Sequence, residues 1–144
     1  MVSGYFTDAD SAASAIVDAG WDKSAQIYVT VNPVNPALLV RANNRLVEFA
    51  TEATKDEDIV RRRWFVLDVD PKCAKKGVAA TAEEMSAALK TRNEVVGCLI
   101  ELGWPQPLTV ASGNGGHAYW PVDLAADEGT TVVFREALVT LAAV

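Results

Sequence analysis

The chain has 144 residues, a length that fits one domain and excludes two full-sized ones, so we expect a single domain over residues 1–144. Half of the residues are hydrophobic and 22% are charged, which is typical of a folded core and excludes a disordered tail. The formal net charge of −6 argues against coating of nucleic acid by bulk electrostatics. Charged residues interrupt every apolar stretch before the roughly 20 residues that span a bilayer, so we expect a soluble, cytoplasmic protein with no membrane partner.

Basic residues concentrate in the middle of the chain. Of the 13 Lys and Arg residues, 11 lie between Arg41 and Arg92. Two interpretations stay open for this distribution. One is a locally basic surface on an acidic protein, and the other is the ordinary solvated charge of loops and helices.

The first part of the chain predicts a helix, a strand and two shorter elements. Residues 7–19 carry apolar side chains at helical spacing between capping residues and Gly20, so we expect a helix there. Residues 26–31 are β-branched and aromatic and stop before a proline, which predicts a strand. A short helix over 36–46 and a brief turn over 56–60 are expected to follow.

The second part of the chain predicts a sheet packed with helices. Residues 63–70 are an apolar run of strand length, which we expect to be the central strand. Thr81 and Glu84 have the spacing of a capping box and open a helix that ends at Gly103. The remaining expected elements are a hairpin of two strands and a last helix, at residues 108–111, 117–122 and 131–144. This order predicts an α/β or α+β fold.

The first candidate site is the pair of acids that closes the apolar strand, Asp68 and Asp70. Residues two apart on a strand point to the same face with Cα atoms roughly 6.5–7 Å apart, so the carboxylates can converge. Two ionised carboxylates at about 5 Å repel by about 3 kcal/mol at an effective dielectric near 20, and a cation removes that repulsion. Mg²⁺ and Mn²⁺ prefer such oxygen ligands. The alternative is structural, with Asp70 opening a turn and Asp68 capping nearby backbone.

The second candidate site is the glycine-rich stretch from Ser112 to His117. Its glycines let the backbone approach a ligand closely, and successive free N–H groups can form an anion nest. A Walker-type phosphate loop is excluded because the stretch lacks the Lys and Ser/Thr of that motif. A plain hairpin turn is the alternative for the glycines. His117, the only histidine in the chain, is either a ligand-binding residue or an ordinary structural one.

A metal site beside a phosphate cradle is the apparatus that nucleotidyl transfer requires. With these two motifs in place, the chain resembles the archaeo-eukaryotic primase superfamily. Within it, the chain resembles the bifunctional DNA primase/polymerase domains common in phages, plasmids and helicase-primase proteins. The motifs that carry the resemblance lie in order at residues 28–36 with Arg41, 56–59, 62–71, 80–84, 103–107 and 112–117.

The resemblance implies an α+β fold, with an N-terminal α/β unit and an RRM-like antiparallel sheet packed with helices. It implies that Asp68 and Asp70 bind the catalytic Mg²⁺ or Mn²⁺ ions and that His117 contacts the phosphates of the incoming nucleotide. Charge and position add basic residues that can grip phosphates, namely Arg61, Arg62, Arg63 and Lys72. The expected nucleotide-binding residues are Arg63, Lys72, Ser112, Gly113, Asn114, Gly115 and His117. The implied partners are nucleoside triphosphates, a DNA template or primer, and a helicase domain or protein.

One motif of the family has no counterpart in this chain. A carboxylate after an apolar residue on a later strand normally completes the metal site, whereas this sequence ends at Val144 in a predicted helix. We therefore expect the core to be incomplete at its C-terminus. Asp123 follows His117 too closely to replace that carboxylate, and Asp127 and Glu128 lie in a loop-like stretch.

Two functions stay open for the chain. The first is template-directed primer synthesis or extension by a nucleotidyltransferase. The second is a non-catalytic module that binds nucleotide or single-stranded nucleic acid, with aromatic side chains as stacking surfaces unless they belong to the core. The candidate aromatics are Trp64, Trp104, Tyr119 and Trp120. A phosphatase with Asp68 as nucleophile is disfavoured because Lys72 stands where that motif needs Thr or Val.

Overall fold

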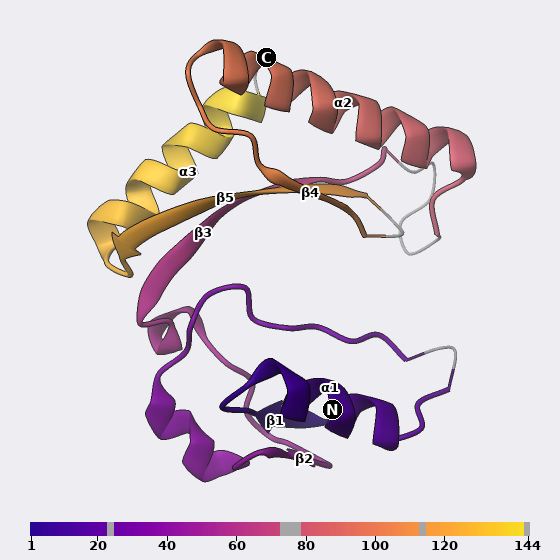
Figure 1. Ribbon diagram of the computed structural model, residues 1–144, viewed down its shortest axis with the longest axis vertical. Helices are drawn as coiled ribbons and strands as arrows, with labels where there is room; N and C mark the ends of the chain where they lie inside the picture. The colour runs from indigo at the N-terminus through magenta and orange to yellow at the C-terminus, as the bar shows by residue number, and fades with distance from the viewer. Residues whose placement is uncertain (23–24, 73–78, 113–114, 143–144) are drawn as a thin grey trace. The chain divides into compact units, whose positions relative to one another are not determined.

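The computed structural model describes residues 1–22, 25–72, 79–112 and 115–142. The chain is mixed α+β with two antiparallel sheets, which confirms the expected fold class at that level. It divides into two compact units, Met1–Arg61 and Arg62–Val144, each with its own sheet (Figure 1). Each unit also has its own hydrophobic core. Within the described part of the chain, every helix is too short or too polar to cross a membrane.

The first unit holds a two-stranded sheet with short helices around it. Its elements in order are β1 (Ser3–Tyr5), α1 (Ala9–Asp18), the 3₁₀ helix η1 (Pro36–Arg41), β2 (Arg45–Val47) and the 3₁₀ helix η2 (Asp56–Asp58). The two strands pair antiparallel, with Tyr5 opposite Arg45. Tyr5, Leu38 and Ala42 form the buried core of this unit.

The expected helix over 7–19 is confirmed as α1. The carboxylate of Asp8 accepts a hydrogen bond from the Ser11 amide at 2.7 Å, which satisfies one of the free N–H groups of the first turn. After the helix, Gly20 has a φ of 62°, a left-handed conformation that glycine adopts at little cost.

Two sequence predictions for the first unit are wrong. The segment 26–31 is not a strand, and Tyr28 and Val29 are 83% and 76% exposed. β-Branched and aromatic residues favour strands because they pack on a half-buried sheet, and here no described strand pairs with the segment. The helix expected over 36–46 is the shorter η1, and the last two residues of that range belong to β2. Strands β1 and β2, of three residues each, are too short to show a sequence pattern.

The second unit holds a three-stranded sheet. Its elements are β3 (Arg61–Val69), α2 (Ala82–Glu101), β4 (Leu108–Ala111), β5 (Gly116–Ala125) and α3 (Glu128–Ala142). The expected strand, long helix, hairpin and last helix are therefore all present. The strand order is β3-β5-β4, so the prediction that the apolar 63–70 run is the central strand is wrong. The hairpin strand β5 takes the centre because it pairs with β3 on one side and β4 on the other.

Helices α2 and α3 pack on one face of this sheet (Figure 1). The buried core residues on the strands are Phe65, Leu67, Ala118 and Trp120, and those on α2 are Val96 and Leu99. Phe134 and Ala137 of α3 pack against them. Trp120 is only 1% exposed, and its indole N–H donates to the carbonyl of Pro105 at 2.9 Å. Because side chains alternate along a strand, the residues between these core positions point to the opposite face.

Candidate functional site

Asp68 lies on the face of the sheet that α2 and α3 do not cover. Its neighbours Leu67 and Val69 both pack into the core, so alternation directs the Asp68 side chain the other way. This side chain is 56% exposed. Asp70 lies one residue beyond the end of β3, two positions from Asp68.

His117 lies on the same face, at the start of β5. The next residue, Ala118, is fully buried against the helices, so the imidazole points away from them. The His117 Nε2 atom lies 3.1 Å from Oδ1 of Asp68. The imidazole side chain is 24% exposed, which leaves it accessible from solvent. The structure thus brings Asp68 of the first candidate site into contact with His117 of the second.

Gly115, in the glycine turn between β4 and β5, packs directly against the end of β3. A Cβ atom added to Gly115 would lie 2.6 Å from the carbonyl oxygen of Val69 and 3.5 Å from the Cα of Asp70. Only glycine permits such a close approach of two backbones. The Ser112 hydroxyl accepts a hydrogen bond from the Gly115 amide at 2.9 Å and closes the turn. The predicted ligands Gly113 and Asn114 lie outside the described residues.

Tyr119 is the second partner of His117. Its hydroxyl lies 2.8 Å from the Nδ1 atom of the imidazole, and its ring meets Trp64 edge-on at 6.3 Å between centroids. An ionised carboxylate only accepts hydrogen bonds, so the Nε2 atom that faces Asp68 carries the hydrogen. In the neutral ring, Nδ1 then accepts from the Tyr119 hydroxyl. Asp68, His117 and Tyr119 thus form a continuous hydrogen-bonded chain across β3 and β5.

The donor chemistry of this face fits a hard divalent ion that is held together with a substrate. Within the described ranges, no three His, Cys, Asp or Glu side chains converge on one point. Asp68 and Asp70 supply carboxylate oxygens. Mg²⁺ is commonly bound through one or two carboxylates, with substrate phosphates and water in its other positions. The two acids therefore fit Mg²⁺ or Mn²⁺ as ligands of a nucleotide-bound ion.

The basic residues predicted for the site do not all gather there. Arg63 forms an ion pair with Asp123 at 3.1 Å. At about 3.3 Å per strand residue, Arg63 is about 16 Å along β3 from Asp68. Arg62 belongs to the helix-covered side, where it donates to the Thr131 hydroxyl at 2.6 Å and stacks on Phe134. Lys72 is exposed and follows Asp70 by two residues.

Asp123 and Asp127, two of the acids weighed above for a third metal-binding carboxylate, have other structural roles. Asp123, six residues from His117 on β5, pairs with Arg63. Asp127 precedes α3, and its Oδ1 atom accepts from the Thr130 amide at 2.8 Å. That hydrogen bond lowers the pKa of Asp127 from its ordinary value of 3.8.

The aromatic candidates divide between the two faces of the sheet. Trp120 is buried in the core, and Trp104 packs on it with 5.6 Å between ring centroids. Trp64 and Tyr119 lie on the face that carries Asp68 and His117. The core interpretation therefore holds for Trp120, whereas Trp104 packs beside it and is 37% exposed.

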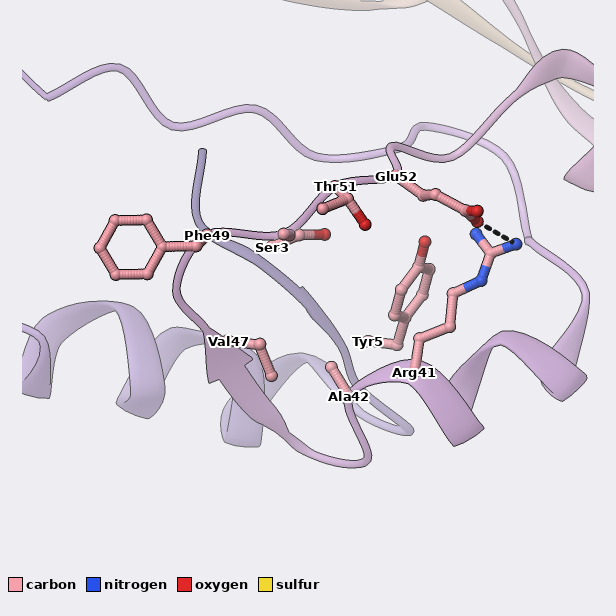
Figure 2. Close-up of a pocket in the computed structure, with 9 residues that line it drawn as sticks. Ser3, Tyr5, Arg41, Ala42, Val47, Phe49, Thr51 and Glu52 are labelled. Atoms are coloured by element: carbon pink, nitrogen blue, oxygen red, sulfur yellow. Dashed lines mark ion pairs between the residues drawn. The ribbon is translucent and has the colours of Figure 1, made fainter.

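A separate cavity of about 280 Å³ lies in the first unit and contains none of the predicted catalytic residues. Figure 2 shows Tyr5 and the Arg41–Glu52 ion pair, of 3.0 Å, on one side of it. A hydrogen bond with Tyr5 and the charge of Glu52 raise the pKa of Arg41. Phe49, at the other side in Figure 2, is 85% exposed and has a φ of 54°.

Two residues that support the site were not singled out from the sequence as its parts. Arg92 is buried and donates to the Val110 carbonyl at 2.9 Å and to the Asn93 side chain, which ties α2 to β4 beside the glycine turn. The sequence feature that could have identified Arg92 is its position among the apolar residues of the predicted helix. Tyr119 was treated only as a stacking residue, although its position two residues after His117 on a strand indicates a shared face.

Comparison of the chain with protein-family models, with curated proteins and with solved structures found no match.

Proposed function

We propose that this chain carries out metal-dependent nucleotidyl transfer of the DNA primase/polymerase type, in which a nucleotide is joined to a DNA primer. One observation carries the proposal: Asp68 on β3 and His117 on β5 lie 3.1 Å apart on the sheet face that α2 and α3 leave uncovered. The glycine turn adjoins this contact, because Gly115 packs against Val69 at the end of β3.

Each part of the site then has a role in holding a nucleoside triphosphate. Asp68 and Asp70 hold Mg²⁺ or Mn²⁺ together with the phosphates. When bound, the ion neutralises charge on the attacking and leaving oxygens. The glycine-rich stretch lies beside the phosphates, because Gly115 packs against Val69 at the end of β3. The imidazole of His117 is kept in one orientation by Asp68 and Tyr119 and lies on the same face of the sheet.

The ligand set predicts that metal and nucleotide bind together. With Asp68 and Asp70 as the proposed protein ligands, the phosphate oxygens of a bound nucleotide add further ligands to the ion and strengthen its binding. Mn²⁺ alone is expected to bind weakly, and its affinity is expected to rise at least tenfold when a nucleoside triphosphate is present. Calorimetric titration of Mn²⁺ with and without nucleotide measures this difference.

The test replaces Asp68 and Asp70 together by asparagine. This variant is expected to lose Mn²⁺-dependent nucleotide binding, because amides neither carry the charge nor coordinate the ion as strongly. The matched control replaces Asp10 and Asp18, which are exposed on α1, and removes the same charge from the other unit. Nucleotide affinity that is equal in the Asp68/Asp70 variant and in the unmodified protein would refute the proposal.

The binding module is the second candidate, and the Trp64–Tyr119 pair on the face of Asp68 favours it. Aromatic side chains on an uncovered sheet face are stacking surfaces for single-stranded nucleic acid. A primer-extension assay with labelled nucleotide separates the two functions. Incorporation that depends on Asp68 supports the enzyme, whereas binding without incorporation supports the module. A DNA template or primer, a helicase partner and a cytoplasmic location belong to the first proposal.

A further inference from the structure

Tyr119, His117 and Asp68 are connected by hydrogen bonds in the order of a nucleophile, a base and an orienting acid. The Tyr119 oxygen lies 2.8 Å from Nδ1 of His117, and Nε2 of the same ring lies 3.1 Å from Asp68. Both distances are within hydrogen-bond reach. A hydroxyl bonded to an imidazole whose other nitrogen faces a carboxylate is the arrangement that activates hydroxyl nucleophiles in enzymes of several unrelated folds.

The other tyrosines lack this environment. The Tyr28 hydroxyl donates to the side-chain oxygen of Gln26, and the Tyr5 hydroxyl contacts Thr54 and Arg41. None of these partners is a base that could accept the phenolic proton. Near the site, the Ser112 hydroxyl is engaged with the amide and the carbonyl of Gly115 and closes the turn. Tyr119 therefore offers a hydroxyl bonded to a base, on the sheet face that α2 and α3 leave uncovered.

We propose that Tyr119 is itself a nucleotidyl acceptor, so that the protein attaches a nucleotide covalently to its own β5 strand. The inference rests on the proposed function, because the same site must bind the nucleoside triphosphate. The Tyr119 oxygen attacks the α-phosphorus and forms an O–P bond, while His117 takes the phenolic proton at Nδ1. The bond between the α-phosphorus and the bridging oxygen breaks, and pyrophosphate leaves with that electron pair. The product is a tyrosyl phosphodiester of a nucleoside monophosphate.

The nucleophile can be tested without any nucleotide. An aryl sulfonyl fluoride transfers its sulfonyl group to activated tyrosine oxygens and releases fluoride, and the chain has only three tyrosines to map by peptide mass spectrometry. Tyr119 is expected to react at least about tenfold faster than Tyr28, although Tyr28 is more exposed, since a positioned base contributes about 10²–10⁴-fold. His117→Gln is expected to remove this advantage. Labelling of Tyr119 no faster than Tyr28, or unchanged labelling in His117→Gln, would overturn the assignment.

The second experiment follows the nucleotide. The full chain is incubated with Mn²⁺ and an α-³²P-labelled nucleoside triphosphate, and the product is examined by denaturing gel and intact mass. One nucleoside monophosphate is expected on the unmodified protein and on Tyr28→Phe, and none on Tyr119→Phe. Near-ultraviolet circular dichroism of the buried Trp120 checks that Tyr119→Phe is folded.

The outcomes separate this inference from the function on which it rests. Calorimetric binding of nucleotide to the unmodified protein without any covalent product overturns the Tyr119 acceptor and leaves the proposed function standing. An adduct that persists in Tyr119→Phe also overturns it. Failure of the unmodified protein to bind nucleotide overturns both.

Discussion

Gly115 allows two backbone segments to approach more closely than any side chain would permit. Its Cα faces the Val69 carbonyl at the end of β3, and that packing holds the glycine turn beside Asp68 and Asp70. The sequence predicted a glycine-rich turn, but glycines in a turn are ordinary. Only the distance to Val69 explains why glycine is required at this position.

A Gly115→Ala substitution tests this packing. The added methyl group would lie 2.6 Å from the Val69 oxygen, so the turn must move away from β3, at a cost of about 1–3 kcal/mol in the free energy of unfolding. Nucleotide binding is expected to weaken in parallel. Gly97→Ala is the control, because its methyl group meets nothing within 4 Å in α2 and is expected to stabilise the helix by about 0.5–1 kcal/mol. Chemical denaturation measures the free energy of unfolding of both variants. Equal changes in Gly115→Ala and Gly97→Ala would contradict the role of Gly115.

At the level of elements, side-chain caps define where the helices begin. Asp8 caps α1, and a reciprocal capping box of Thr81 and Glu84 opens α2. Thr81 accepts from the Glu84 amide at 3.2 Å, and Glu84 accepts from the Thr81 amide at 2.8 Å. This box could be predicted from the sequence because its partners are three residues apart. Asp127 acts in the same way at α3.

The cap at Asp127 predicts a pH-dependent contribution to stability. Because the Thr130 amide lowers the pKa of Asp127 in the folded protein, its stabilisation is present above the ordinary value of 3.8 and is lost as the pH falls through the lowered value. Asp127→Ala is therefore expected to reduce the melting temperature at pH 7. The difference in melting temperature between Asp127→Ala and the unmodified protein should become smaller below about pH 4. Asp127→Asn is the control, because it keeps an acceptor oxygen but does not titrate. A loss of melting temperature in Asp127→Ala that does not change with pH would contradict this assignment.

At the level of the whole molecule, two cores stabilise two parts of the chain. Every buried residue of one core lies between Tyr5 and Ala42, and every buried residue of the other lies between Phe65 and Trp120. The expectation of one domain rested on chain length. Chain length does not reveal the division into two cores, because the division depends on which residues pack together.

Substitutions in each core should act on different parts of the chain. Phe65→Ala is expected to cost about 3–5 kcal/mol and Leu38→Ala about 2–5 kcal/mol, since both remove large buried side chains. Hydrogen exchange followed by mass spectrometry should show faster exchange over residues 62–144 in the first variant and over 1–61 in the second. Equal acceleration throughout the chain in both variants would show that the two units unfold as one.

The sequence by itself determined most helices and the strands of the second unit, because caps, helical spacing and alternation are local. It also placed Asp68 and His117 at the ends of strands. Only the tertiary structure decided that β5 is central, that residues 26–31 pair with none of the described strands, and that Tyr119 completes a chain with His117 and Asp68. These features depend on which strands pair and in what register. Strand pairing joins residues far apart in the chain, so no local pattern specifies it.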